Sequence, residues 1–326
     1  MKTHYTIPIF IPESACPFRC TYCNQYNITQ KATSPTPDEV VSVIQQYLAT
    51  IPPNNPDIEI KAAFFGGSFT GLPISEQQRY LEVVSPFIES RQVDSVQLST
   101  RPDYINQEIL DLLKLHHVKL IELGAQSLDP QVLQLTRRGH TVEDVEKSSH
   151  LILQNGFELG LQMMVGLLGD SKEKSFETAQ KIVSLKAHYT RIYPTLVIKD
   201  TDLETAYFKG EYTPLTLDQA IDWVAPLFTL FENHQVQILR IGLHPSEGFI
   251  NRDTLVAGPF HVSFKELVLT EIWKEKLLKL SENNHSDTFI IEVPKSEINY
   301  AIGYQSKNRK MLEQRFQKVI FKQLSN

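Results

Sequence analysis

All three cysteines of this 326-residue chain fall in one stretch, Cys16-Pro17-Phe18-Arg19-Cys20-Thr21-Tyr22-Cys23, with the spacing C-x3-C-x2-C. Three thiolates on one short loop can bind three irons of a 4Fe-4S cluster and leave the fourth iron open for a small molecule. The alternatives are a structural zinc knuckle, a disulfide beside a spare thiol, or buried thiols. Zinc usually takes a fourth protein ligand, and the chain has no further cysteine to supply one. The favoured interpretation is a cluster-binding loop.

The composition is that of an ordinary globular protein, and the length suits one large domain plus a small one. The amino terminus, Met1-Lys2-Thr3-His4-Tyr5, lacks the apolar core of a signal peptide, and no apolar run is long enough to span a bilayer. Clustered cysteines without an export signal predict the reducing cytoplasm as the location, with no membrane partner. The net charge of −6 excludes a generally basic nucleic-acid coat but leaves room for a local basic patch.

Short apolar strands and amphipathic helices alternate along the chain as far as residue 241. The predicted strands span residues 7–12, 58–65, 95–99, 118–123, 157–165, 189–198 and 236–241; the predicted helices span residues 37–50, 76–90, 105–115, 130–136, 142–155, 172–185 and 217–233. This alternation predicts right-handed βαβ units on a parallel sheet. Six or seven strands are too few for a closed eight-stranded barrel.

Glycines and polar residues follow the predicted strands at their carboxyl ends, where α/β barrels carry their active sites. The cysteine loop follows the first strand. Later strands end in Gly66-Gly67-Ser68, Ser99-Thr100-Arg101, Gly124-Ala125-Gln126-Ser127, Gln162-Met163-Met164 and Arg191-Ile192-Tyr193. We therefore expect the strand ends to line one shared site. A Gly-Gly pair after a strand is, by itself, also typical of a plain turn.

The cysteine spacing resembles that of the radical S-adenosylmethionine (radical SAM) superfamily. The resemblance implies an α/β fold with an open, partial (β/α)6 barrel, and it makes Cys16, Cys20 and Cys23 the metal ligands. It also implies two cofactors, a 4Fe-4S cluster and SAM. In that superfamily the open iron chelates SAM, and one electron releases a 5′-deoxyadenosyl radical. An electron donor, such as a reductase, a flavodoxin or a ferredoxin, is therefore an expected partner.

Several strand-end residues match cofactor-binding positions of the superfamily, and in particular of the branch that contains coproporphyrinogen dehydrogenases. The matching residues are Gly66, Gly67, Ser68, Ser99, Gln126, Arg138 and Gln162. The Gly-Gly backbone contacts the SAM amino group in the superfamily, and the later polar residues hold its ribose and carboxylate. An arginine fork such as that of Arg138 suits a carboxylate. Ser68, Ser99 and Gln162 stand where acidic residues are usual. Exposed loop residues are the alternative at Ser99, Gln162 and Arg138.

Several longer sequence stretches resemble those of the catalytic subunit of the Elongator tRNA-modifying complex, and the resemblance covers roughly residues 1 to 245. They are Arg101-Pro102-Asp103-Tyr104-Ile105, Glu122-Leu123-Gly124, Arg137-Arg138-Gly139-His140-Thr141, Ile192-Tyr193-Pro194-Thr195-Leu196-Val197-Ile198 and Gly210-Glu211-Tyr212-Thr213-Pro214. That family joins its radical SAM domain to an acetyltransferase and modifies carbon five of a wobble uridine. We expect no acetyltransferase domain here, so the carboxymethyl transfer is not carried over. His244 and His261 are either substrate-facing or ordinary loop residues.

The last part of the chain carries a charge opposite to that of the whole. Residues 289–326 hold five Lys and two Arg against three Glu, a net of +4. Their predicted order is a strand (289–294), a helix (295–302), a loop, a helix (307–316) and a strand (318–322). This order resembles the core of a KH domain, whose Gly-x-x-Gly loop clamps single-stranded RNA; Ser306 replaces the second glycine. The RNA-binding candidates are Gly303, Tyr304, Lys307, Arg309 and Lys310, and a small α+β cap on the barrel is the alternative.

The sequence thus predicts a radical SAM barrel over residues 1–245, a connecting loop and helix over 246–284, and a KH-like segment over 285–326. The favoured hypothesis is a radical SAM enzyme that modifies a base in RNA, with tRNA as its partner. A second hypothesis keeps the radical chemistry but acts on a small molecule such as a tetrapyrrole. A third is a non-catalytic, cluster-bearing protein that binds RNA or carries haem, and it predicts SAM binding without cleavage.

Overall fold

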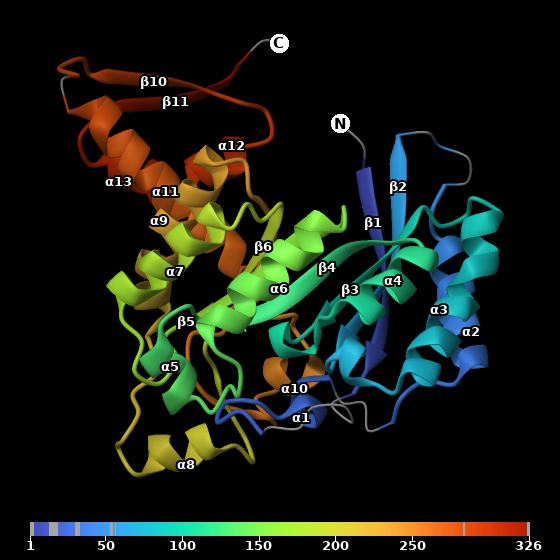
Figure 1. Ribbon diagram of the computed structural model, residues 1–326. Helices are drawn as coiled ribbons and strands as arrows, with labels where there is room; N and C mark the ends of the chain where they lie inside the picture. Colours follow the sequence, from blue (N-terminus) through green and yellow to red (C-terminus); the bar gives the residue numbers. More distant parts are fainter. Residues whose placement is uncertain are drawn as a thin grey trace.

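The computed structural model describes residues 3–12, 19–29, 33–52, 55, 57–282 and 284–324. Its central feature is a sheet of seven strands in the order β1-β2-β3-β4-β5-β6-β8, and every neighbouring pair is parallel. The strands are β1 (Thr3–Ile11), β2 (Ile58–Gly66), β3 (Ser95–Thr100), β4 (Val118–Gln126), β5 (Glu158–Val165), β6 (Tyr189–Pro194) and β8 (Gln237–Ile241). The predicted parallel sheet is confirmed, and it curls into the open half-barrel that Figure 1 shows.

Most helices of the barrel cover the outer face of the sheet. Those of the barrel are α1 (Gln25–Thr29), α2 (Pro37–Leu48), α3 (Ile74–Glu89), α4 (Gln107–Leu115), α5 (Pro130–Leu135), α6 (Val142–Gln154), α7 (Lys172–Ser184), α8 (Asp202–Phe208) and α9 (Leu217–Asn233). Several start at local signals, because a threonine N-cap and the side chain three residues later bond each other's backbone at α2, α6 and α9. Such caps lie within four residues of sequence, so the start of each of these three helices can be predicted from the sequence.

The two faces of the sheet differ in chemistry. Side chains alternate across a strand, and Ile7, Ile9 and Ile11 of β1 point into a fully buried core that they share with Val40 and Ile44 of α2. The inner face carries polar side chains instead, among them Thr6, Gln97, Gln162 and Arg191. The core under the helices is therefore apolar, whereas the inner face combines polar side chains with apolar ones such as Phe10 and Phe65.

One predicted strand is wrong in extent. The strand expected over residues 189–198 splits into β6, which stays in the main sheet, and β7 (Val197–Ile198), which pairs antiparallel with β9 (Leu255–Ala257). The neighbouring strand β5 ends at Val165, where Gly166 turns the chain with a φ of 75°. Past Pro194, the Thr195 N–H still donates to the Val165 carbonyl of β5 at 2.9 Å, and Val197 and Ile198 then pair with β9 instead of the main sheet. The segment predicted as a connecting loop and helix over 246–284 accordingly contains β9 and α10 (Glu247–Ile250) as well.

A small C-terminal module follows the long helix α11 (Phe264–Ser281). The module consists of β10 (Thr288–Val293), α12 (Ile298–Ile302), α13 (Lys307–Glu313) and β11 (Lys318–Gln323), and β10 runs parallel to β11. Helix α11 belongs to two cores, because Val268 packs in the barrel core whereas Trp273 and Leu277 pack in the core of the module. The strand–helix–helix–strand order is as expected, while its assignment as a KH domain stays a prediction.

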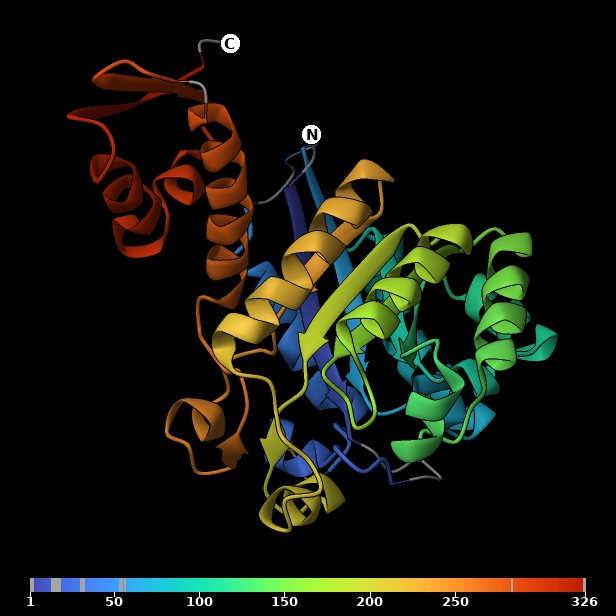
Figure 2. The same ribbon diagram turned by 90° about the vertical axis from the view of Figure 1, so that its left-hand side faces the viewer.

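The module and the cysteine loop lie at different ends of the molecule. In Figures 1 and 2 the strands of the barrel run away from the module, which stands beside the amino ends of β1 and β2. Helices α1 and α8 mark the opposite end, where the strands finish (Figure 1). Within the described ranges, none of the helices combines the length and apolarity needed to cross a bilayer.

Candidate functional site

A cavity of about 870 Å³ lies inside the half-barrel and reaches the carboxyl ends of the strands. This volume is at the large end of the range for small-molecule sites, roughly 300–1,000 Å³. All seven strands and the loop after β1 contribute to its wall. The residues predicted to bind the cofactor all line it: Gly66, Gly67, Ser68, Ser99, Gln126, Arg138 and Gln162. The structure therefore brings together residues that are up to 96 positions apart in the sequence.

Of the three cysteines, Cys16 lies outside the described residues, whereas Cys20 and Cys23 both line the cavity. The Cys23 N–H donates to the Cys20 carbonyl at 3.1 Å and closes a tight turn. Thr21 ties this turn to two helices, since its N–H donates to the Thr136 carbonyl (3.1 Å) and its carbonyl accepts from the Leu203 N–H (2.8 Å). Both sulfur atoms thus sit on a braced loop at the wall of the cavity.

Arg138 is the cation that contacts this loop. Its Nη1 donates to Cys20 Sγ at 3.4 Å, and its Nη2 donates to the Gly124 carbonyl at 2.8 Å. Burial alone would lower the pKa of the guanidinium, but the Tyr22 hydroxyl and the Cys20 thiol raise it above its ordinary value. A buried N–H donor of fixed charge stabilises a thiolate. Two thiols beside such a donor are a set that fits a sulfur-ligated iron cluster.

Arg101 positions Arg138, and sequence reasoning assigned it no role. The Arg101 side chain is 1% exposed. Its Nη1 donates to the Arg138 carbonyl at 2.8 Å, while Nε and Nη2 each donate to the Asp103 carboxylate at 2.9 Å. An arginine directly after a strand, with a carboxylate two residues later, was the signal available for this role.

His140 is a buried, neutral side chain near Arg138 and Arg101. Its Nε2 lies 3.2 Å from the Ala125 carbonyl. Burial, and then the Arg138 and Arg101 guanidinium groups, lower the pKa of His140 to about 3. The ring therefore carries its proton on Nε2 and donates it to the end of β4, and Nδ1 has no hydrogen-bond partner among the described residues.

The Gly66-Gly67-Ser68 element ends β2 against the end of β1. At Gly66 a Cβ would lie 2.3 Å from the Ile11 carbonyl oxygen, and φ is 109°, so only glycine fits. The Gly67 N–H donates to that same carbonyl at 2.6 Å. Gln25 of α1 donates from Nε2 to the Gly66 carbonyl, also at 2.6 Å. The glycines therefore fix the entrance of the cysteine loop as well as exposing backbone to the cavity.

Gln126 and Gln162 form a pair across neighbouring strands. The Gln162 Nε2 donates to the Gln126 Oε1 at 3.1 Å, and Gln126 adopts a φ of 64° at the end of β4. Ser99, on β3, lines the same wall. The amide pair presents two neutral polar side chains at the wall of the cavity.

A second polar group inside the barrel was missed by sequence reasoning. Arg191 on β6 donates from Nε and Nη2 to the Glu122 carboxylate of β4, at 2.5 and 3.0 Å. Gln97 on β3 donates to the same carboxylate. Arg191 and Gln97 line the cavity, while Glu122 is 3% exposed behind them. Burial would lower the pKa of Arg191, but Glu122 holds it above its ordinary value.

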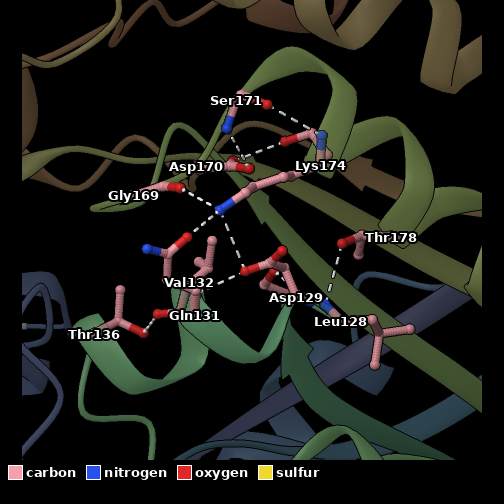
Figure 3. A network of polar contacts seen from close by, with 12 residues as sticks. Leu128, Asp129, Gln131, Val132, Thr136, Gly169, Asp170, Ser171, Lys174 and Thr178 are labelled. Carbon is pink, nitrogen blue, oxygen red and sulfur yellow. Dashed lines mark hydrogen bonds and ion pairs between the residues drawn. The ribbon is translucent and has the colours of Figure 1, made fainter.

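A further network braces the helices next to the cysteine loop (Figure 3). Lys174 of α7 donates from Nζ to the Gly169 carbonyl (3.0 Å), to Gln131 (2.9 Å) and to Asp129 (3.4 Å), and Asp129 caps α5. Asp170 accepts from the Gly166 and Ser171 N–H groups. Burial raises the pKa of Asp170 above its ordinary value. This network joins α7 to α5. The residue that ends α5, Thr136, in turn accepts a hydrogen bond from the Thr21 N–H of the cysteine loop.

The RNA-binding candidates lie in the C-terminal module and not at the cavity. Gly303 turns the chain with a φ of 88°. The Tyr304 N–H donates to Thr270 Oγ1 at 2.9 Å, and its ring meets His261 edge-on with centroids 5.5 Å apart. Arg309 stacks over the Phe321 ring. Two candidates are exposed: Lys307 and Lys310.

Two family models match the chain. The model "Radical SAM superfamily" matches residues 11–182, and "Radical_SAM C-terminal domain" matches residues 187–274. A tRNA uridine(34) acetyltransferase of Methanocaldococcus jannaschii is 35% identical over 132 residues, which are 39% of this chain and 24% of that protein. Elongator complex protein 3 of Homo sapiens is 30% identical over 138 residues, or 41% and 25% of the two proteins.

The fold has a solved counterpart in the archaeal Elp3 of Methanocaldococcus infernus. The two structures superpose with a TM-score of 0.67 at 21% identity, over 85% of this chain and 64% of the other. The chain therefore spans only part of the length of the proteins that it resembles, a quarter in the case of the two curated relatives. The expected resemblance to the Elongator catalytic subunit is confirmed, and the chain belongs to the radical SAM superfamily of enzymes.

Proposed function

We propose that this enzyme binds a 4Fe-4S cluster through Cys16, Cys20 and Cys23, cleaves SAM reductively, and modifies a base in tRNA. When bound, the cluster and SAM supply a 5′-deoxyadenosyl radical for hydrogen abstraction or radical addition. One observation carries the proposal: all seven residues expected to bind SAM line one cavity together with Cys20 and Cys23.

The side chains of the chain have separate tasks in this scheme. Arg138 keeps a positive charge beside Cys20 Sγ and presents the same guanidinium to the cavity, where the carboxylate of SAM would bind. Ser68, Ser99 and the Gln126–Gln162 pair offer neutral hydrogen-bonding groups for the amino group and ribose.

The choice of tRNA as substrate rests on the names of the relatives and on the charge of the C-terminal module. Relatives over the radical SAM region are named for tRNA uridine modification and for Elongator. Residues 289–326 carry a net charge of +4, in a chain of net −6, and exposed lysines of this kind bind phosphate backbones. A reductase, flavodoxin or ferredoxin as electron donor, and the cytoplasm as location, complete the proposal.

Anaerobic reconstitution tests the cofactor half of the proposal. The reconstituted protein is expected to hold one 4Fe-4S cluster and to release 5′-deoxyadenosine from SAM on reduction. Cys20→Ala should remove both properties, because two cysteines cannot hold three irons. Serine variants at the three positions serve as isosteric controls. A triple Cys→Ala variant that kept full iron and full cleavage would overturn the cofactor assignment.

Mass spectrometry of tRNA nucleosides tests the substrate half. Cells that lack the protein should lose one modified nucleoside, and the wild-type gene should restore it, whereas a Cys20→Ala gene should not. An unchanged nucleoside profile together with intact SAM cleavage would instead point to a small-molecule substrate.

A further inference from the structure

Two arginines on the inner face of the barrel have no task in the cofactor scheme. Arg191 of β6 and Arg240 of β8 are register partners on adjacent parallel strands, and both line the cavity. Adjacent strands are roughly 5 Å apart, so two bare guanidinium groups at such positions would repel each other. The two arginines differ in their partners: Arg191 forms an ion pair with a carboxylate, whereas Arg240 hydrogen-bonds neutral groups. This difference indicates what each arginine can bind.

Arg191 is neutralised. Glu122 accepts two of its five N–H groups, and the guanidinium lies over the Phe65 ring, 5.0 Å from the ring centroid. A glycine makes room for this carboxylate, because a Cβ at Gly160 would lie 2.8 Å from Glu122 Cγ. The ion pair is almost buried, with Arg191 15% and Glu122 4% exposed. Arg191 also hydrogen-bonds the Tyr193 side chain. Its remaining N–H groups face the cavity without net charge, which suits a neutral carbonyl oxygen and not an anion.

Arg240 keeps its charge. Its Nε donates to the Gly242 carbonyl at 3.1 Å, and its Nη2 contacts His244 Nδ1 at 3.0 Å. Burial and the neighbouring Arg240 lower the pKa of His244, so its ring is neutral at pH 7 and accepts this bond. No carboxylate of the described residues forms an ion pair with Arg240. A partly exposed guanidinium of full charge suits a phosphate group.

We propose that these two arginines together bind one nucleotide of the substrate. Arg191 donates to a carbonyl oxygen of the base, and Arg240 binds the phosphate. The inference rests on the proposed function, which it deepens by naming the residues that recognise an oxo-substituted base. Glu122 and Gln97 are positioning residues for Arg191, and Phe10 and Phe65 supply aromatic surface on the same wall. A ligand with several carboxylates would not match a wall on which one of the two arginines is already neutralised.

Three probes separate the two contacts on the full-length protein. Uridine carries the base without phosphate, ribose 5-phosphate carries phosphate without the base, and uridine 5′-monophosphate carries both. Arg191→Lys preserves the charge opposite Glu122 but loses the planar fork. It should weaken uridine and uridine monophosphate about tenfold and leave ribose 5-phosphate unchanged. Arg240→Gln should weaken ribose 5-phosphate and uridine monophosphate about tenfold and leave uridine unchanged.

Two further variants serve as a control for nonspecific loss of binding and as a test of the Arg191 charge. Arg252→Gln, an exposed arginine that does not line the cavity, should change none of the three affinities. Glu122→Gln leaves the Arg191 charge uncompensated, so ribose 5-phosphate should bind severalfold tighter. Thermal melting of each variant shows whether it is folded. Equal losses for all three probes in both arginine variants, or no binding of any probe by the wild type, would overturn the inference.

An anticodon stem-loop distinguishes this failure from failure of the proposed function. A stem-loop that binds wild type, Arg191→Lys and Arg240→Gln equally well overturns the two-arginine site while the tRNA function stands. Separate losses for the three small probes, with an unchanged tRNA nucleoside profile in cells lacking the protein, support the site and overturn tRNA as the substrate.

Discussion

Three arginines inside the half-barrel each have a different chemical partner. Arg101 pairs with Asp103, Arg138 donates to the Cys20 sulfur, and Arg191 pairs with Glu122. Removing one member of a buried pair leaves the other charge without compensation and costs several kcal/mol. Arg101 and Arg191 are therefore held in place by permanent ion pairs. The partner of Arg138 is a thiol, whose charge changes when it binds a metal.

His140 makes the stability of the protein sensitive to mild acid. Its pKa is about 3 in the folded state and about 6.5 in an unfolded chain. The unfolded state therefore takes up the proton first, and stability falls as pH drops from about 6.5 towards 3, by at most about 1.4 kcal/mol per pH unit. Above pH 6.5 this contribution to the pH dependence vanishes.

His140→Gln keeps a donor for the Ala125 carbonyl and removes the titration. We expect the free energy of unfolding of the wild type to fall more steeply than that of the variant between pH 6.5 and pH 4.5. Urea denaturation at three pH values measures the difference, in which the titration of carboxylates cancels. Parallel pH profiles for the two proteins would show that His140 is not held neutral.

At the scale of elements, the helices begin at local signals but are held by contacts from far along the chain. Helix α7 starts with a Ser171 cap that the sequence carries within four residues. Its place against α5 depends on Lys174, whose acceptors lie up to 45 positions away. The cap determines where the helix starts, and the lysine determines what it packs against.

Lys174→Gln should lower the free energy of unfolding by about 1 kcal/mol, since it removes a partly buried ion pair and two hydrogen bonds that water replaces only in part. Thermal and urea denaturation measure the change. Lys147→Gln on α6 is the matched control, because the Lys147–Glu143 pair is about 70% exposed on both sides and should contribute almost nothing. Equal stability of the two variants would contradict a bracing role for the network in Figure 3.

At the scale of the whole molecule, the C-terminal module stands near the amino ends of the strands, whereas helices α1 and α8 mark the opposite end, where the strands finish (Figures 1 and 2). A substrate that contacts both the module and the cysteine loop must reach from one end of the strands to the other. The module shares an apolar core with α11 through Trp273 and Leu277. Truncation would expose that core, so changes of surface charge are the sharper test.

Lys307→Gln together with Lys310→Gln should weaken tRNA binding and flatten its salt dependence. Two lost phosphate contacts reduce the slope of log K against log salt by about 1.5. Filter binding at several salt concentrations measures the slope, and cluster content should not change. Lys147→Gln with Lys186→Gln removes the same charge from exposed positions elsewhere. An equal effect of the two pairs would mean that only total charge matters.

The order of strands and helices was predictable because it follows from patterns within about ten residues: apolar periodicity, threonine caps and glycines at strand ends. Gly66 illustrates this, since its role in the turn is visible in the sequence. The short pair β7–β9 was not predictable, because its strands are some 60 residues apart and nothing local reveals their pairing. The same holds for the split of the strand at Pro194.

The sequence by itself determined the family, the parallel half-barrel and the residues that face its cavity at the strand ends. All of these follow from short sequence motifs and from the spacing between them. The partners of the buried charges were decided only by the tertiary structure. Glu122 and Arg191 lie 69 positions apart, and Arg101 reaches the Arg138 carbonyl across 37. Such pairs form because the curl of the sheet brings inward-facing side chains of different strands within reach of one another.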